Sequence, residues 1–398
     1  MLESKRWRLA IKLAAIPVIL AGAAALSHAI VPPRYQSLCD LVLFSLLAMD
    51  IAALMPRRWM QLPLIALYSL SLGLAAVETL SLIQSPPART SSVQTPGGLF
   101  ADNPVLGWAA DRPGPVREIK TDLATGHTIF DATYTIDADG LRRTVSPADR
   151  PTVAFFGDSW VFGEGVADAA AMPQVFADLS EGRWRVLNFG FPGYGPEQFL
   201  RAVETGIDDR LLGPDLKYAV FTTFADQIRR TDCSASYVIR APRYALDAAG
   251  QATFAGPCYG GAARAAMEVV TNTAIYKRYV EPYRAIIRRD DVALYVATIL
   301  RAAALVKEKY GAATVVIYDR VKESDYFAAA GVTDDEIMAR LRRGGVLVLD
   351  MSIAGRLPQG VDAIIEGDGH PSAAAQRARA EVLTDYLAKV DQTAAGRP

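Results

Sequence analysis

Two long apolar runs near the N-terminus constrain what this chain can fold into. Residues 13–31 (LAAIPVILAGAAALSHAIV) and residues 59–77 (WMQLPLIALYSLSLGLAAV) contain no Asp, Glu, Lys or Arg. A helix that spans the hydrocarbon core of a bilayer needs about 20 mainly apolar residues, and both runs meet this requirement. A weaker run over residues 41–55 lies between them and is interrupted by Asp50. We therefore expect residues 1–84 to form a transmembrane anchor.

The basic residues beside these runs favour three spanning helices. One basic cluster precedes the first run, and a second, Arg57 and Arg58, lies between the weaker run and the last run. The positive-inside rule places both clusters in the cytoplasm, which requires the middle helix to exist. Three spans put the rest of the chain outside the cytoplasm, whereas two spans would leave it inside. The expected spans cover about residues 9–31, 37–55 and 59–83.

The first run has a second interpretation, a signal peptide. Ser27-His28-Ala29 loosely resembles the small-x-small site at which such peptides are cleaved. The run is long for a signal peptide, and further hydrophobic stretches follow it. With three spans, the expected location is a bacterial inner (cytoplasmic) membrane, with the soluble part facing the periplasm or the outside.

Charge and cysteine usage exclude some classes of function. The 42 basic and 43 acidic residues nearly balance, so there is no electrostatic reason to expect nucleic-acid binding. Three histidines, three cysteines and no CxxC pattern give no reason to expect a metal site or another cofactor. Cys233 and Cys258 share one polar stretch. They would form a disulfide outside the cytoplasm, or remain as two unpaired thiols.

The rest of the chain divides by composition. Residues 85–98 are rich in Pro, Ser, Thr and Gly and are predicted to be a linker. Residues 99–150 are predicted to be a small β-rich lead-in. In residues 151–398, short apolar runs alternate with amphipathic segments, which indicates α/β architecture with a parallel sheet covered on both faces. An insertion over about residues 229–291 interrupts the alternation and is either a lid or substrate-binding flap, or an ordinary solvated loop.

The alternating pattern predicts individual elements. The expected strands cover residues 152–156, 184–187, 217–222, 313–318 and 345–349. The expected helices cover residues 173–179, 196–207, 292–310, 334–341 and 372–390.

The first candidate site lies in the segment VAFFGDSWVFGEGV, residues 153–166. A predicted buried strand ends in Gly157-Asp158-Ser159, and Gly163 and Gly165 follow. Glycine permits tight turns. Such a turn can hold a serine hydroxyl at the open edge of the sheet, with backbone N–H groups facing an oxyanion. The tripeptide is also common turn chemistry, in which Asp or Ser caps a helix.

The second candidate site is the sequence Gly-Asp-Gly-His-Pro-Ser near the C-terminus, which contains His370. A serine hydroxyl is a poor nucleophile until a histidine accepts its proton, and the histidine needs an acid to orient it. His28 lies in the first apolar run and His127 in the lead-in, so His370 is the candidate base. Asp368 and Glu366 precede it. The alternative is a surface histidine that caps the last helix.

Together, three segments resemble sequence blocks of the SGNH/GDSL hydrolases. Gly157-Asp158-Ser159 with Gly163 resembles block I, Asn188–Gly193 (NFGFPG) resembles block II, and Asp368-Gly369-His370-Pro371 resembles block V. The resemblance covers about residues 150–390. It implies a flavodoxin-like three-layer α/β/α fold and ester hydrolysis or acyl transfer through an acyl-serine. The catalytic residues that it implies are Ser159, Asp368 and His370, with oxyanion-hole N–H groups from Ser159 and Gly193.

The chain departs from the family pattern in two places. The family's block III usually supplies an Asn side chain to the oxyanion hole, but this chain has Asp226 and Gln227 after the third predicted strand. One of them would have to fill that position. An ionised Asp226 would repel an oxyanion, and losing one donor costs about 3 kcal/mol. The family's acid sits three residues before the histidine, where this chain has Gly367. Asp368 is therefore the expected acid, with Glu366 in reserve.

Membrane-anchored, outward-facing SGNH domains resemble proteins that add or remove acyl groups on exopolysaccharides and cell-wall glycans. The resemblance implies a serine esterase or O-acyltransferase with an acylated glycan as substrate, and a transferase would need a membrane partner that supplies the acyl donor. The alternative is a catalytically weak SGNH-like module that binds glycan or partner proteins in a polysaccharide assembly machine. The insertion carries polar and aromatic residues that would suit a sugar-binding flap: Asp232, Tyr237, Arg240, Arg243, Tyr244 and Tyr259.

Overall fold

The computed structural model describes residues 15–395 except 17, 20, 88 and 321–326. These residues fall into two compact units. The anchor unit comprises the described residues up to Pro87 together with Ala265–Tyr283. The sheet unit comprises the described residues of Ala88–Arg264 and Arg284–Pro398. One stretch of the predicted insertion therefore belongs with the N-terminal helices.

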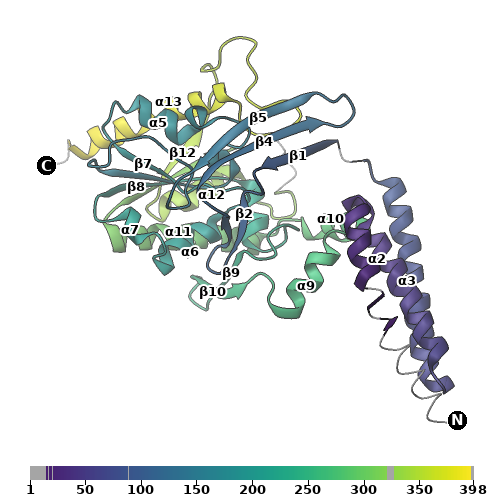
Figure 1. The fold of residues 1–398 in the computed structure, drawn as a ribbon. Coiled ribbons are helices and arrows are strands. Elements are labelled where there is room, and N and C mark those ends of the chain that lie inside the picture. The colour runs from purple at the N-terminus through teal and green to yellow at the C-terminus, as the bar shows by residue number, and fades with distance from the viewer. Residues whose placement is uncertain (1–14, 17, 20, 88, 321–326, 396–398) are drawn as a thin grey trace. The chain divides into compact units, whose positions relative to one another are not determined.

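The anchor unit contains two long apolar helices, α2 (Pro33–Leu54) and α3 (Arg58–Gln84) (Figure 1). By length and composition, both can cross a membrane. Large apolar side chains along α3 are exposed: Leu62 by 65%, Leu70 by 62% and Leu80 by 56%. A helix in the core of a soluble protein would bury such side chains, so the surface of α3 suits lipid.

Helices α2 and α3 correspond to the second and third spans expected from the sequence. The first expected span, about residues 9–31, lies partly outside the described residues. Its described part contains an apolar helix, Ala21–Ile30, that is shorter than a spanning helix. Helices α2 and α3 contact each other through the buried hydroxyls of Ser45 and Ser71, whose Oγ atoms lie 2.8 Å apart. Small side chains of this kind let membrane helices approach closely.

The sheet unit is built on a five-stranded parallel sheet. Counted along the chain, the strand order is 2-1-3-4-5, which is the flavodoxin-like order. The predicted α/β fold is therefore confirmed, and the predicted strands differ from the observed ones only at their ends. The strands are β6 (Thr152–Phe156), β7 (Arg185–Asn188), β8 (Leu216–Phe224), β11 (Ala313–Asp319) and β12 (Leu347–Met351).

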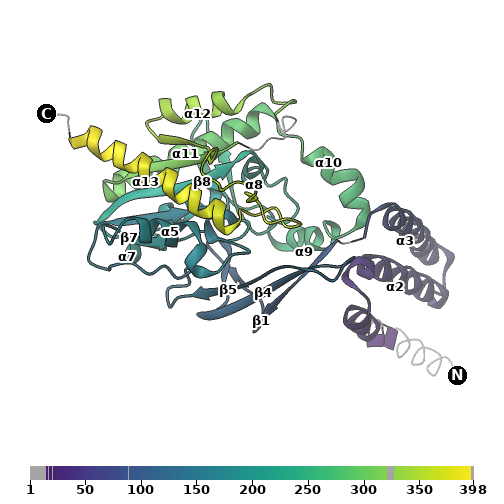
Figure 2. The ribbon, with the colours of Figure 1, turned by 90° about the horizontal axis from the view of Figure 1, so that it is seen from above.

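Two helical layers cover the sheet. All five residues of β6 are buried and alternate between two cores: Val153 and Phe155 pack on one face, Ala154 and Phe156 on the other. Helices α5 (Met172–Leu179) and α13 (Ala373–Ala395) cover the first face (Figure 2, seen from that side). The other face is covered by α6 (Pro196–Thr205), α11 (Arg289–Tyr310) and α12 (Asp334–Arg343).

The lead-in before the parallel sheet is β-rich. Its main sheet is antiparallel with the order β1–β4–β5, and β2 pairs with β3. The side chains of Tyr134 and Phe130 share a core with Phe162 and Phe191 of the α/β region. The lead-in is thus part of the sheet unit and not a separate domain. Its strands are β1 (Thr90–Thr95), β2 (Phe100–Asn103), β3 (Gly107–Ala110), β4 (Gly114–Asp122) and β5 (Thr128–Ile136).

The predicted linker, residues 85–98, differs from expectation because it contains strand β1. Val93 of β1 lies opposite Ile119 of β4 in an antiparallel register. The segment TSSVQT carries β-branched residues that favour strands, and the Pro and Gly residues that suggested a linker stand on either side of it. The apparent linker is therefore an edge strand with short connections.

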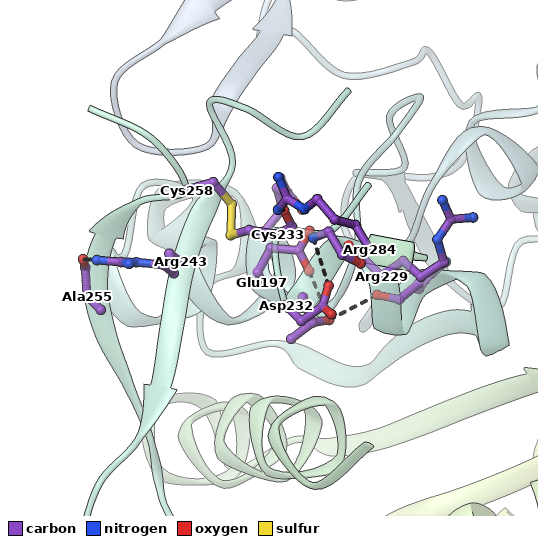
Figure 3. Close-up of a disulfide and its surroundings, with 12 residues drawn as sticks. Glu197, Arg229, Asp232, Cys233, Arg243, Ala255, Cys258 and Arg284 are labelled. Atoms are coloured by element: carbon purple, nitrogen blue, oxygen red, sulfur yellow. Dashed lines mark hydrogen bonds between the residues drawn. A yellow bond between two sulfur atoms is a disulfide. The ribbon is translucent and has the colours of Figure 1, made fainter. Parts of the chain in front are cut away.

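The insertion, residues 229–291, is structured. A disulfide joins Cys233, just after helix α8, to Cys258, just after strand β10 (Figure 3). Of the two interpretations of these cysteines, the structure shows the bonded one. Helix α11 begins at Arg289 and not at residue 292, because the Asp291 side chain accepts from the Arg288 N–H and caps its first turn. The elements are α8 (Ile228–Thr231), β9 (Pro242–Leu246), β10 (Ala252–Pro257), α9 (Gly261–Val270), the π-helix η3 (Tyr276–Val280) and α10 (Glu281–Arg284).

Candidate active site

Ser159 lies at the carboxyl edge of the parallel sheet. It is the first residue of α4 (Ser159–Phe162), directly after β6 and a two-residue turn. Asp158 caps this short helix by accepting from the N–H of Trp160 at 3.0 Å. Gly157 has a φ of 152°, and a Cβ there would lie 2.6 Å from a methyl group of Val161. The turn therefore requires glycine, and it places the serine where α/β folds bind their ligands.

Ser159, His370 and Asp368 form one hydrogen-bonded chain. The Nε2 atom of His370 lies 2.8 Å from the Oγ atom of Ser159, and its Nδ1 atom lies 2.6 Å from Oδ2 of Asp368. Gly369 has a φ of 100°, so the chain turns sharply between acid and base. The same carboxylate oxygen also accepts from the backbone N–H of His370 at 3.1 Å. Glu366, the reserve acid, is exposed, and the structure gives it no contact with His370.

Lys120 adds a fourth member to this chain. Its Nζ atom lies 2.5 Å from Oδ1 of Asp368, and the Asp368 side chain is completely buried. Motif analysis missed Lys120 because it comes from strand β4 of the lead-in. In the structure Val116 and Glu118 are buried, and the two-residue period of a strand places Lys120 on the same inward face of β4. A lysine on an inward strand face requires a partner.

The surroundings set the charges of the acid and the base. Burial alone would raise the pKa of Asp368, but hydrogen bonds from His370 and Lys120 outweigh it and lower the pKa to about 2. Burial alone would lower the pKa of His370, but its hydrogen bond with Asp368 and the nearby charge of Glu164 raise the pKa above its ordinary value. The arrangement favours an ionised acid beside an imidazole that readily takes a proton.

Glu164 is a further carboxylate that the sequence analysis did not identify. Its Oε2 atom lies 3.6 Å from Nε2 of His370, and burial raises its pKa. Glu164, Asp368 and His370 are close enough to be considered as metal ligands. Both ring nitrogens of His370, however, form hydrogen bonds, one with Ser159 and one with Asp368. The Lys120 ammonium group occupies the other carboxylate oxygen of Asp368. We assign no metal site to this cluster.

Asp226 and Gln227 are placed differently from the expectation that one supplies a third oxyanion donor. Gln227 is completely buried, and its amide group donates to Oδ2 of Asp158 at 3.0 Å while accepting from Thr223 at 2.9 Å. Asp226 accepts from Arg229 at 3.1 Å. The Gln227 side chain thus fixes the turn that carries Ser159, and Asp226 is neutralised by an arginine.

Arg230, which the motifs did not indicate, completes this anchoring of Asp158. Its Nη1 atom donates to Oδ2 of Asp158 at 2.8 Å and to the carbonyl of Tyr194 at 2.5 Å. Its Nη2 atom lies 3.6 Å from the Asp226 carboxylate. Arg230 and Asp158 are both buried, and a buried charge pair is stable only when its hydrogen bonds are satisfied. The pair therefore joins the block I turn to helix α8.

Two backbone N–H groups remain as candidate oxyanion donors. Within the described part of the chain, the N–H groups of Ser159 and Gly193 donate to no other residue. Gly193 has a φ of 83°, and the rings of Trp108 and Tyr237 lie within 4 Å of the position that a Cβ would take. The indole N–H of Trp108 donates to the carbonyl of Pro192 at 3.0 Å, which holds this loop in place.

Arg142, also missed by the motifs, fixes the loop after the nucleophile. Its side chain is completely buried, and its guanidinium donates to the carbonyls of Phe162 and Gly163 at 2.6 Å and of Val166 at 2.7 Å. It also pairs with Asp168 at 3.1 Å. Arg142 thereby provides hydrogen bonds to several carbonyl groups that would otherwise lack partners. These bonds fix the loop that carries Glu164.

The residues suggested for a sugar-binding flap have different positions. Tyr237 lies beside Gly193 and accepts from Nε of Arg230 at 2.9 Å, with 53% of its surface exposed. The other five make contacts that support the insertion. Asp232 accepts from Ser234, Arg240 pairs with Asp102, and Arg243 donates to Ala255 (Figure 3); Tyr244 donates to Glu204, and the Tyr259 ring faces Arg284.

A cavity of about 320 Å³ lies between the lead-in and helix α6. Apolar side chains such as Leu106, Phe189 and Phe199 form much of its wall. Its lining includes Gly157 but none of Ser159, Asp368 and His370. The hydrogen-bonded chain, and not this cavity, therefore defines the candidate active site.

No family model matches this chain, and no curated protein matches it. Among solved structures, a chain described as "a putative SGNH hydrolase from Slackia heliotrinireducens" is similar over 60% of this chain and 100% of its own length. The sequence identity is 16% and the TM-score is 0.30. We draw no conclusion from a likeness at this level, so the fold is assigned from the strand order and the site from its own contacts.

Proposed function

We propose that this protein is a membrane-anchored serine esterase or O-acyltransferase that acts on acyl groups of extracellular or cell-wall polysaccharide. The observation that carries the proposal is the continuous chain of hydrogen bonds from Ser159 through His370 and Asp368 to Lys120. A serine, a histidine and a buried carboxylate in this order are the groups that nucleophilic acyl transfer requires.

The geometry supports a two-step reaction. In the first step Ser159 Oγ attacks the ester carbonyl, and its proton passes to Nε2 of His370. The N–H groups of Ser159 and Gly193 would stabilise the negative oxygen of the tetrahedral intermediate. When the carbon–oxygen bond of the ester breaks, His370 returns the proton to the leaving sugar oxygen, and the acyl group stays on Ser159. In the second step His370 takes a proton from water or from another sugar hydroxyl, which attacks the acyl-serine. When the bond between the acyl carbon and Ser159 Oγ breaks, His370 returns this proton to Oγ.

Two observations support the membrane anchor and the outward orientation. The apolar side chains of α3 are exposed along its length, which suits lipid and not water. The disulfide between Cys233 and Cys258 is of a kind that persists in oxidising compartments such as the periplasm. Alkaline phosphatase fused after the last helix should be active in a bacterial host. A fusion that fluoresces only in the cytoplasm should be dark, and the opposite pair of results would reverse the topology.

The glycan substrate is inferred from the surroundings of the candidate oxyanion donor. Trp108 and the half-exposed Tyr237 flank Gly193, and aromatic rings combine apolar faces with polar edges, as sugar rings do. Transfer to a second glycan hydroxyl would also require a membrane partner that supplies the acyl donor. Hydrolysis would require only water, so release of free acid from an acetylated glycan by the purified protein would indicate an esterase.

A second candidate function is a catalytically weak module that binds glycan or a partner protein. The observation that favours it is the position of Gln227, whose amide is committed to Asp158 and Thr223 and does not replace the family's Asn donor. An oxyanion hole with one donor fewer would slow acyl transfer on the order of a hundredfold or more.

A serine-directed fluorophosphonate probe separates the two candidates. The enzyme should be labelled, and labelling should be lost in both Ser159→Ala and His370→Ala. Ser180→Ala is the matched control, because the Ser180 hydroxyl donates to the carbonyl of Phe176 at the C-terminal end of helix α5. Labelling that survives in Ser159→Ala, or that never occurs in a protein shown to be folded, would favour the binding module.

A further inference from the structure

The anchor unit includes residues 265–283, a stretch of the insertion far from the N-terminal helices in sequence. This stretch, here called the return segment, contains the end of helix α9 and the π-helix η3. Nothing in its composition had separated it from the rest of the insertion. Hydrogen bonds join this segment to one acidic residue of helix α3.

That residue is Glu78, which is completely buried although it lies on an apolar helix. One oxygen of its carboxylate accepts from the backbone N–H of Ala274 at 2.8 Å, and the other accepts from the N–H of Ile275 at 2.9 Å. The hydroxyl of Ser37 on helix α2 donates to the first oxygen at 2.6 Å. A buried carboxylate needs such donors, and removing it would leave two backbone N–H groups unpaired. Glu78 thus holds the return segment to both apolar helices.

The position of Glu78 along α3 corresponds to a membrane boundary. An α-helix rises 1.5 Å per residue, so Glu78 lies about 30 Å along the helix from Arg58. The hydrocarbon core of a bilayer is also about 30 Å thick. Polar contacts gather at the same end of the helix, where Arg34 donates to the carbonyls of Leu82 and Ser85 at 2.7 and 2.8 Å. If Arg58 lies at one face of the bilayer, Glu78 and the return segment lie at the other.

The outer surface of the return segment has the composition of an interfacial helix. It exposes valine and tyrosine side chains together with two neighbouring cations, Lys277 and Arg278. Tyrosine favours the headgroup level of a bilayer, and Lys or Arg beside apolar residues favours anionic lipid surfaces. The exposed apolar and aromatic residues are Val269 (57%), Val270 (42%), Tyr279 (48%), Val280 (40%) and Tyr283 (70%).

We propose that the return segment is a second membrane attachment, which lies in the lipid interface with its valines and tyrosines in contact with lipid and its two cations among anionic headgroups. The chain would then touch the bilayer again between β10 and α11, after the sheet unit has begun. The inference rests on the membrane anchoring proposed above. Its occupant is a lipid surface, because the segment is continuous with the helices that are long and apolar enough to cross a membrane.

Fluorescence quenching in nanodiscs tests the proposal. The experiment uses the full chain with Cys39→Ser, which removes the free cysteine and leaves the two cysteines of the disulfide. In this background a single cysteine that carries the NBD label replaces either Tyr279 or Tyr283. Nanodiscs contain phosphatidylethanolamine and phosphatidylglycerol with doxyl quenchers placed either shallow or deep in the acyl chains. We expect blue-shifted emission at both positions and stronger quenching by the shallow doxyl group. NBD-labelled glutathione provides the aqueous reference.

Further variants distinguish failure of the membrane anchor from failure of the interfacial attachment. Leu70→Cys, labelled in the same way, reports on the middle of α3 and should be quenched most by the deep doxyl group; if it is not, the membrane anchor itself is wrong. If Leu70→Cys is quenched but the labels at 279 and 283 match the aqueous reference, the return segment is not at the interface. Glu78→Ala should reduce quenching at 279 at least twofold, whereas Thr79→Ala, on the same helix turn, should not. Equal quenching in both variants would contradict the role of Glu78.

Discussion

Lys120 and Asp368 are 248 residues apart in sequence, yet the Nζ atom of one lies 2.5 Å from a carboxylate oxygen of the other. The contact brings the lead-in into the candidate active site. Because the second oxygen of Asp368 binds the imidazole of His370 at 2.6 Å, Lys120 is placed to orient the acid that orients the base. Lys120 does not touch the serine, so its proposed role is positioning.

Lys120→Met should therefore lower kcat by about ten- to a hundredfold with little change in KM, since a hydrogen bond to a charged group contributes about 1.5–3 kcal/mol. Steady-state hydrolysis of a small acetyl ester provides the measurement. Lys120→Arg should recover part of the loss, because it keeps the charge. Lys217→Met, an exposed lysine on strand β8, is the control. Equal losses in the Met and Arg variants, with KM raised in both, would indicate a structural role only.

The pKa of His370 predicts how activity depends on pH. Only the neutral imidazole can accept the Ser159 proton, and the pKa of His370 is raised above its ordinary value of 6.5. The kcat/KM for ester hydrolysis should therefore rise with pH and reach half its plateau above pH 6.5. The carboxylate should not limit activity in this range, since the pKa of Asp368 is about 2. A half-plateau at or below the ordinary histidine value would contradict this electrostatic description.

The same two groups make stability depend on pH in opposite directions. Because the pKa of His370 is raised on folding, its contribution is full below about pH 6.5 and is lost as the pH rises through the folded pKa. Because the pKa of Asp368 is lowered from 3.8 to about 2, its contribution is present above about pH 3.8 and is lost as the pH falls toward 2. Chemical denaturation of the wild type and of His370→Ala at several pH values measures the contribution of His370 to the free energy of unfolding.

Glu164→Gln should move the pH profile toward acid. The charge of Glu164 helps to raise the pKa of His370, and glutamine keeps the shape of the side chain without the charge. The half-plateau of kcat/KM should shift to lower pH, whereas Glu308→Gln, an exposed change on α11, should not shift it. A profile that stays in place would mean that Glu164 is already protonated over this range, as its own raised pKa would allow.

Asp226→Asn tests whether Asp226 acts at the oxyanion hole. An ionised Asp226 at the oxyanion hole would make this change activating by one or two powers of ten. Since Asp226 is instead paired with Arg229 and Arg230, we expect activity to change by less than about threefold. Gln227→Ala should destabilise the fold by about 1–3 kcal/mol, because Asp158 loses a buried donor. A large rise in activity in Asp226→Asn would restore the third-donor hypothesis.

Replacing Cys233 and Cys258 together by serine should lower the free energy of unfolding by about 3 kcal/mol, since the bond closes a loop with a sequence separation of 25 residues. Chemical denaturation of the detergent-solubilised protein, followed by circular dichroism, measures the loss. Reducing the wild type should reproduce it, whereas Cys39→Ser, which removes the free cysteine, should not. Identical unfolding of reduced and oxidised wild type would show that the disulfide adds no stability.

The fold could be predicted from sequence where a local pattern determines it. Each parallel strand is buried on both faces, so β6 and β8 are continuous apolar runs bounded by turn residues. Strand β1 escaped prediction because its neighbours Pro and Gly dominate the composition of that stretch. The return segment escaped prediction because its hydrogen bonds to the anchor unit go to Glu78, which lies nearly 200 residues earlier.

In the candidate site, too, local sequence patterns predict some residues, whereas others depend on contacts between distant parts of the chain. Ser159 and His370 could be identified because their local turns carry the chemistry, and because only three histidines exist in the chain. Lys120 and Arg142 could not, since a lysine and an arginine in a β-rich segment look like surface residues until the fold buries them. Their position after the third strand predicts that Asp226 or Gln227 supplies a donor to the oxyanion hole. In the structure Asp226 contacts Arg229, and Gln227 contacts Asp158. The spacing of residues in the sequence does not predict these contacts.

The contributions of the lead-in also determine how far this protein can be shortened. A fragment that began at residue 151 would keep every block that resembles the SGNH family, yet it would lack Lys120 and the buried guanidinium of Arg142. It would also uncover Phe162 and Phe191, which pack against lead-in side chains. A fragment that keeps a complete site therefore starts before β4, and the sequence blocks alone understate the length of chain on which the chemistry depends.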